Sequence, residues 1–275
     1  MAKIPFKVSA RTARLIGREN IASSKGAIIE LVKNAYDADS SFCIVYFSSD
    51  SLYIIDAGEG MTDSIIRNCW MTIGTDNKST HFTTHGGRVK AGAKGIGRFA
   101  LDKLGERCEM FTFFDPTVHE DKNEDDEASD FCGYHWIVNW NDFEGKEKTI
   151  DHVSAELEGI SDLTYMDCLR QLPLTSSLEK LVGDKSLSHG TILKISGLRD
   201  IWDDEAIKNV YEDLGVLVPP SENRDFTISL VSLDSPQKYG EVESSFCDDF
   251  DYKIVAHADA DQNVNIRIYL NSATL

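Results

Sequence analysis

The sequence predicts an α/β fold, in which helices pack against a β-sheet, and three observations support this. Segments whose apolar residues recur at helical spacing alternate along the chain with shorter segments of strand character. Hydrophobic residues make up 41% of the 275 residues, which is enough for a sizeable core without disulfides. No run approaches about 18 consecutive apolar residues, so we expect no transmembrane helix.

Six segments are predicted to be helical from their apolar spacing and from residues suited to helix ends. The spacing is clearest in the second, where Ile28, Leu31 and Ala35 fall on one face. Ser9 is suited to cap the first helix and Gly17 to end it, and a proline interrupts the fifth. In chain order the predicted helices cover residues 10–16, 24–38, 63–70, 97–104, 165–183 and 205–218.

Nine segments are predicted to be strands because apolar or alternating residues lie between polar turns. In chain order they cover residues 42–47, 52–55, 108–114, 134–140, 153–157, 191–195, 226–233, 252–257 and 264–270. The polar stretch over residues 75–92 shows no period. We expect a long functional loop there, mobile without a ligand and ordered with one.

Two consecutive prolines at positions 219–220 are the best candidate for a domain boundary. We expect a first domain over residues 1–200. Residues 201–275 would then hold a connecting helix and the start of a second, incomplete domain.

Charge and cysteine usage narrow the class of protein. The 28 Lys and Arg against 46 Asp and Glu leave a net charge of −18, which argues against direct nucleic-acid or acidic-lipid binding by the chain as a whole. The six cysteines are widely spread and form no C-x-x-C pair, so neither zinc nor a disulfide framework is expected. With no apolar signal segment at the start, we expect a cytoplasmic protein that does not bind membranes.

A first set of polar residues lies on the predicted helix 24–38. Glu30, Asn34 and Asp37 stand at i, i+4 and i+7, so they share the face opposite the apolar stripe. Two carboxylates and an amide in one row could hold a hydrated Mg²⁺ and orient a water molecule. The alternative is an ordinary solvated helix face.

A second set follows the apolar strand 52–55. Asp56 stands at the strand end, followed by Gly58, Gly60 and Met61, and the glycines would let the backbone approach a flat ligand closely. A buried aspartate there could accept a hydrogen bond from the exocyclic amine of adenine. The alternative is a turn in which Asp and Gly serve only as turn formers.

A third set is glycine-rich and leads into the predicted helix 97–104. Backbone amides at a helix start can cradle phosphate, and the lysines and arginines of this region add positive charge. A P-loop pattern is absent, and the loose dinucleotide fingerprint lacks the strand that should precede it. The alternative is an exposed basic loop. The residues concerned are Lys78, Arg88, Lys90, Gly92, Lys94, Gly95, Ile96, Gly97 and Arg98.

A fourth signal, weak by itself, is Thr191 after His189-Gly190, whose hydroxyl could bond a base or Asp56. In order and spacing, E-x-x-x-N-A-x-D-A, D-x-G-x-G-M, G-x-x-G-x-G and G-T together resemble the GHKL ATPase superfamily, over roughly residues 9–197. That superfamily includes gyrase B, the large heat-shock chaperone, MutL, the histidine kinases and MORC proteins. The resemblance implies a Bergerat α/β sandwich with a mixed sheet, helices on one face and a mobile lid. It also implies part of a second, transducer-like α/β domain.

The resemblance further implies roles for individual residues, with ATP and Mg²⁺ as ligands. Glu30 would be the general base for the attacking water, Asn34 would ligate Mg²⁺, and Asp37 would support the magnesium shell or the phosphate side. Asp56 would bind the adenine amine, assisted by Thr191. Gly58, Gly60 and Met61 would shape the base pocket, and the lid contacting the phosphates would include Lys78, Gly92, Lys94, Gly95, Ile96 and Gly97.

The function that follows is Mg²⁺-dependent ATP hydrolysis driving lid closure and homodimerisation in a larger protein, in the manner of a MORC-like or phage-defence ATPase. Glu30 favours a hydrolase over a histidine-kinase-like phosphotransferase, because histidine kinases do not normally carry the catalytic glutamate there. A non-hydrolysing ATP-binding scaffold is the third alternative. The sequence does not identify an effector or client.

Overall fold

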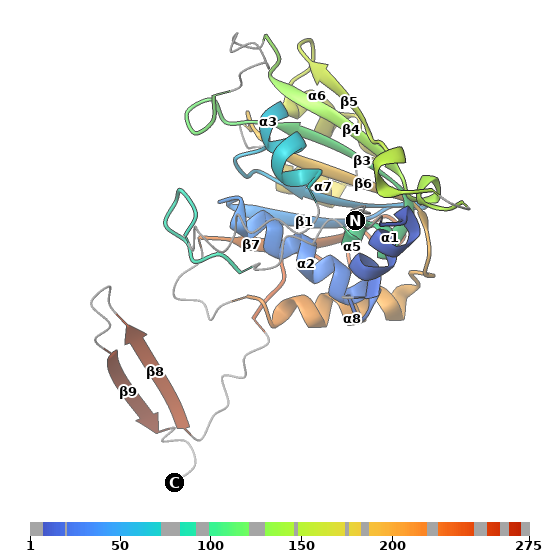
Figure 1. The fold of residues 1–275 in the computed structure, drawn as a ribbon. Helices are drawn as coiled ribbons and strands as arrows, with labels where there is room; N and C mark the ends of the chain where they lie inside the picture. Colours follow the sequence, from blue (N-terminus) through green and yellow to red (C-terminus); the bar gives the residue numbers. More distant parts are fainter. Residues whose placement is uncertain are drawn as a thin grey trace, which may run out of the picture.

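A computed structural model confirms the α/β class of the chain (Figure 1). It describes residues 8–19, 21–72, 83–91, 99–120, 130–145, 148–173, 176–182, 187–218, 225–244, 252–258 and 264–270. The helices are α1 (Ala10–Glu19), α2 (Ser24–Asp37), α3 (Asp63–Ile65) with the π-helical turn η1 (Ile66–Trp70), α5 (Phe99–Leu104), the 3₁₀ turns η2 (Trp140–Phe143) and η3 (Ile150–His152), α6 (Tyr165–Arg170), α7 (Ser176–Val182) and α8 (Asp204–Gly215).

Seven strands form one mixed sheet in the order β5-β4-β3-β6-β2-β1-β7. Only β1 and β7 run parallel among its neighbouring pairs, and the others are antiparallel. The strands are β1 (Phe42–Phe47), β2 (Ser51–Asp56), β3 (Gly105–Phe113), β4 (Gly133–Asn139), β5 (Glu156–Ile160), β6 (Gly190–Leu198) and β7 (Thr227–Ser232). A separate two-stranded sheet pairs β8 (Tyr252–Ala258) with β9 (Val264–Leu270).

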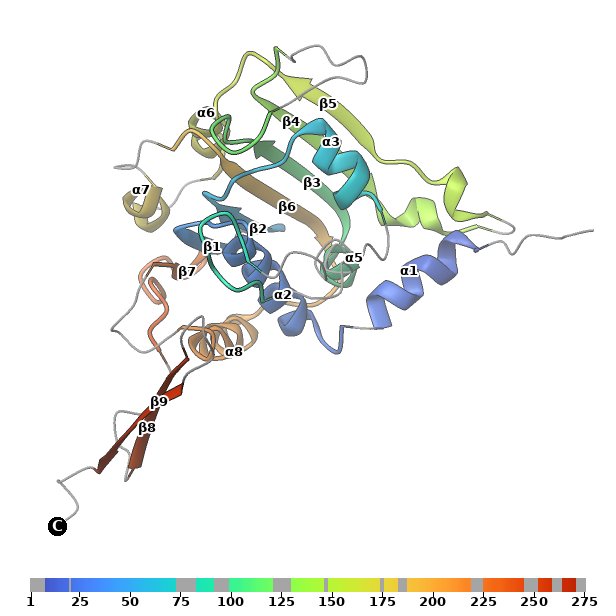
Figure 2. The same cartoon turned by 60° about the vertical axis from the view of Figure 1, so that its left-hand side comes forward.

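Helices cover both faces of the large sheet, which corrects the expectation of helices on one face. The larger core lies under α1, α2, α5 and α8 and includes Ile28, Leu31 and Ile207. The second core contains Leu169 from α6 and Leu178 from α7, and Figure 2 shows these two helices apart from α1, α2 and α5. The physical reason is that β1 and β2 are buried along their whole length, so both of their faces need a cover.

Several predicted element boundaries are confirmed and others are corrected. The Ser9 hydroxyl accepts the Thr12 amide at 3.1 Å, as expected of a cap, but α1 continues past Gly17 to Glu19. A glycine inside a helix costs only about 1 kcal/mol, so it need not end one. The predicted helix 165–183 is two helices, α6 and α7, on either side of Pro173.

The expected division at residue 200 stays a prediction, and the elements on either side of it contact one another. Helix α8 contributes Val210 and Leu214 to the larger core, and β7, which follows the two prolines, pairs in parallel with β1. The sheet therefore draws on both sides of the expected boundary. Beyond residue 244 the structure describes only the β8–β9 hairpin, which lies away from the large sheet in both views (Figures 1 and 2).

Candidate nucleotide site

Helix α2 carries the first predicted set of residues on one continuous helical face. Its start is capped by Ser23, whose side chain accepts the Gly26 amide at 3.1 Å. The apolar side of α2 is buried against the sheet, as the spacing predicted, while Glu30, Asn34 and Asp37 are only partly buried. The Glu30 carboxylate pairs with Lys33 Nζ at 2.9 Å on the same helix.

Asp56 is the last residue of β2, and its side chain is buried, with 8% of the residue exposed. One carboxylate oxygen accepts the Gly58 amide at 2.8 Å. Burial raises the pKa of Asp56 to about 6, while backbone hydrogen bonds at Gly58 and Thr191 and the charge of nearby His189 act in the opposite direction. A buried carboxylate that keeps free lone pairs is suited to accept a hydrogen bond from a ligand amine.

The glycines after Asp56 are required by close backbone approaches. A Cβ on Gly58 would lie 2.7 Å from both the Cβ and the carbonyl oxygen of Ala38. Gly60 has a φ of +66°, and a Cβ there would overlap the carbonyl oxygen of Phe113. The residue types therefore let the 56–61 turn lie close to the end of α2 and to β3. The expected approach of these glycines to a flat ligand stays a prediction.

Backbone and side-chain hydrogen bonds bring the predicted sets together. The Glu59 amide donates to the Ala38 carbonyl at 2.9 Å, which joins the 56–61 turn to the end of α2. The Met61 amide donates to Thr112 Oγ1 at 2.9 Å, and Thr112 Oγ1 lies 3.1 Å from Thr191 Oγ1. Met61 and Thr191 thus meet at one buried threonine of β3, and Asp56 is the partner of Thr191 on the neighbouring strand β2.

Three residues at this site were not predicted from the sequence. Thr112 gives no local signal because its contacts run across strands. Tyr165 donates its hydroxyl hydrogen to the Asp56 carbonyl, and the Nδ1 of His189 donates to the Gly58 carbonyl at 2.7 Å. Only His189 had a signal, its position directly before the predicted Gly-Thr pair.

Part of the predicted loop 75–92 is described, and it reaches the face of α2. The Ala91 amide donates to Asp37 Oδ1 at 2.6 Å. The predicted lid residues Lys78, Gly92, Lys94, Gly95, Ile96 and Gly97 lie outside the described residues, so their roles remain predictions.

The described residues fit a magnesium ion that is held mainly by water and nucleotide phosphates and by few protein ligands. No group of three or more His, Cys, Asp or Glu in the described part of the chain could hold a metal ion. Magnesium commonly keeps several waters and takes its remaining ligands from one or two protein groups and the phosphates of a nucleotide. The Asn34 amide, with the α2 carboxylates beside it, fits that smaller role.

Comparison with known proteins supports a nucleotide site. Residues 22–157 match the family described as histidine kinase-, DNA gyrase B-, and HSP90-like ATPase. The chain is also 30% identical over 91 residues to a putative type II restriction enzyme, HgiDII, of Herpetosiphon aurantiacus. That match covers 33% of this chain and 15% of that protein. No described helix is long and apolar enough to cross a membrane.

Proposed function

We propose that this chain binds and hydrolyses ATP in the presence of Mg²⁺, and the premise is its family: residues 22–157 belong to the histidine kinase-, DNA gyrase B- and HSP90-like ATPases. The observation that carries the proposal is the buried Asp56 carboxylate, held between the Gly58 amide and the start of β6. It would accept a hydrogen bond from the adenine amine, with Thr191 beside it on β6. Gly58, Gly60 and Met61 would line the base.

The partly buried face of α2 would carry the chemistry. Glu30 would accept the proton of the attacking water once that water displaces the Lys33 ammonium from the Glu30 carboxylate. Asn34 would contribute to the magnesium shell, and the ion would neutralise charge that develops on the phosphates. Asp37 would stand on the phosphate side, one helical turn further along.

We extend the proposal to a switch. ATP binding would order a lid that includes Lys78 and residues 92–97, and the ordered lid would bring two copies of the protein together. The partial likeness to a putative restriction enzyme supports a setting in bacterial defence, in keeping with a MORC-like or phage-defence ATPase. The cytoplasm is the proposed location.

Steady-state phosphate release tests the proposal. The wild-type protein should hydrolyse ATP only with Mg²⁺, and Glu30→Gln should lose about 10²–10⁴-fold in turnover while still binding ATP, the usual effect of removing a positioned base. Glu212→Gln is the matched control, since Glu212 is an exposed helical glutamate paired with Lys208.

Two outcomes would reject parts of the proposal. Normal turnover by Glu30→Gln would remove Glu30 as the base. Stable transfer of labelled phosphate to the protein without phosphate release would favour the phosphotransferase alternative.

A further inference from the structure

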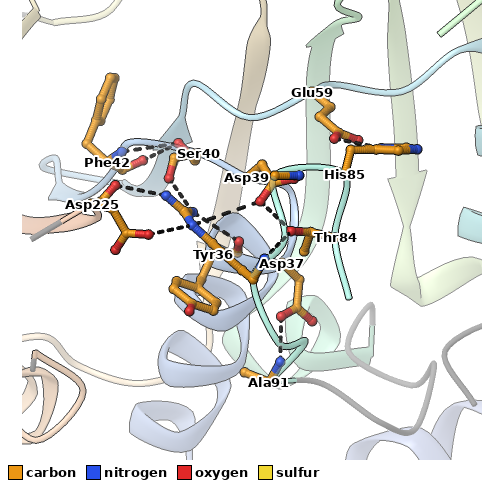
Figure 3. Close-up of polar contacts among 12 residues, drawn as sticks. Tyr36, Asp37, Asp39, Ser40, Phe42, Glu59, Thr84, His85, Ala91 and Asp225 are labelled. Carbon is orange, nitrogen blue, oxygen red and sulfur yellow. Dashed lines mark hydrogen bonds and ion pairs between the residues drawn. The ribbon is translucent and has the colours of Figure 1, made fainter. Parts of the chain in front are cut away.

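The loop segment 83–91 is bound to the C-terminal end of α2 by side chains of α2 and of the residues directly after it. Asp39 accepts the Thr84 hydroxyl at 2.5 Å and the Gly86 amide at 2.6 Å through its two oxygens. Asp37 accepts the Ala91 amide at 2.6 Å (Figure 3). Asp39 itself has a φ of +56°, a left-handed conformation that is uncommon for a residue other than glycine.

Arg88 forms the centre of this attachment. Its guanidinium donates to the carbonyl oxygen of Ser40 at 2.7 Å and to that of Tyr36, in the last turn of α2, at 3.3 Å. It also donates to the Asp225 carbonyl at 2.8 Å and to the Asp225 carboxylate at 3.1 Å. The side chain is only 12% exposed. Arg88 thus binds protein groups, whereas the sequence analysis counted it among the cations for phosphate.

Aromatic rings complete the packing around the guanidinium. Its central carbon lies 4.9 Å from the ring centroid of Tyr36 and 5.8 Å from that of Phe226, and the two rings meet edge to face. Only arginine offers a planar fork of five donors together with a face that stacks on aromatic rings. A lysine at position 88 could replace one of the hydrogen bonds of Arg88, but not all of them together with the ring contacts.

The other side of the segment is attached to the 56–61 turn. Nδ1 of His85 lies 2.8 Å from Glu59 Oε1, and the Glu59 amide donates to the Ala38 carbonyl (Figure 3 shows Glu59 beside His85). The segment 83–91 therefore connects the two sets of residues that the proposed function assigns to magnesium and to adenine.

We propose that Arg88 is a positioning residue of the nucleotide site. By fixing segment 83–91 to the end of α2, it keeps the Ala91 amide on Asp37 and so sets the orientation of that carboxylate, one turn from Asn34. The inference rests on the proposed function. Arg88 does not contact Glu30, which lies two turns away on α2. Loss of Arg88 should therefore weaken Mg²⁺–ATP binding and leave the chemical step almost intact.

The test compares Arg88→Lys and Asp39→Asn with the wild-type protein. Asparagine tolerates the left-handed conformation of Asp39 well, so this second variant changes the attachment without backbone strain. Each variant should raise the KM for Mg²⁺–ATP by about tenfold or more and change kcat by less than about threefold, a loss near 1.4 kcal/mol in binding. A partly unfolded preparation would instead lower kcat and leave KM unchanged.

A second readout does not depend on activity. Hydrogen exchange should become faster in residues 84–91 of both variants, because a segment less firmly attached to α2 breaks the hydrogen bonds from the Gly86 and Ala91 amides to the side chains of residues 39 and 37 more often. Residues 42–56 should keep wild-type protection. Arg170→Lys is the matched control. The Arg170 side chain is 67% exposed, and within the described residues its guanidinium forms an ion pair with Asp167.

Two failures can be told apart. Wild-type KM in both variants of an active enzyme, or unchanged exchange in residues 84–91, would overturn the role of Arg88 alone. Failure of the wild-type protein to bind or hydrolyse ATP would overturn the proposed function and this inference with it.

Discussion

Asp56 and Thr191 are direct partners on the antiparallel strands β2 and β6, so a buried carboxylate and a buried hydroxyl stand at the same end of the sheet. Gly190, directly before Thr191, has a φ of +142°, and a Cβ there would overlap the Asp56 carbonyl oxygen. The Gly-Thr pair thus permits the close approach of β6 to Asp56. This pairing explains why two motifs 135 residues apart in number (191 − 56 = 135) belong to one site.

The raised pKa of Asp56 predicts a pH-dependent stability. Between the ordinary value of 3.8 and about 6 the folded state binds more protons at this group than the unfolded state does. The free energy of unfolding should therefore fall as pH rises through this window, by about 2 kcal/mol between pH 4.5 and 7.

Denaturant unfolding of the wild-type protein and Asp56→Asn, in parallel at several pH values, measures this effect, because titrations common to both proteins cancel. The wild-type protein should lose stability relative to the variant as the pH increases. A relative gain would show that the ionised carboxylate is stabilised in the fold.

Gly60→Ala should destabilise the fold by at least about 2 kcal/mol, because the left-handed backbone and a clash with Phe113 act together. Gly87→Ala is the matched control. Gly87 also has a positive φ, +84°, but a Cβ there meets nothing within 4 Å. Chemical denaturation of both variants separates the cost of the left-handed backbone from the cost of the overlap with Phe113. Equal losses of unfolding free energy would mean that the 56–61 turn can move away from β3.

Asp102→Asn should cost about 3 kcal/mol or more in stability, because it removes the buried charge partner of Arg14 and leaves that buried cation only the half-exposed carboxylate of Glu144. Asp102 is fully buried and accepts from Arg14 Nε at 2.7 Å and from Arg199 Nη2 at 3.0 Å. Asp213→Asn removes an exposed partner of Lys25 and should cost less than about 1 kcal/mol. Thermal unfolding of the two variants compares these losses, and similar midpoints would argue against a structural role for the buried network that joins α1 to α5.

The sequence predicted the bounds of helices and strands better than it predicted which of these elements pack against one another. Strand β1 has the predicted bounds, residues 42–47, because an apolar run between polar turns leaves little choice. The parallel addition of β7 to β1, and the cover that α6 and α7 give the second face, depend on contacts between distant segments and leave no local pattern. At the site, Asp56 and its glycines were predictable from their order. Thr112 and the carbonyl contacts of Arg88 were not, because they exist only once strands and loop meet.

Calorimetric titration with Mg²⁺–ATP, of the wild-type protein and of Asp56→Asn, tests the central claim most directly. The wild-type protein should bind, and the variant should bind about 1.5–3 kcal/mol more weakly, roughly ten- to a hundredfold in Kd, because the adenine amine loses a charged acceptor. The variant must be folded, which the unfolding measurements establish. No binding by the wild-type protein would contradict an ATP site in this chain, and equal affinities would contradict its placement at Asp56.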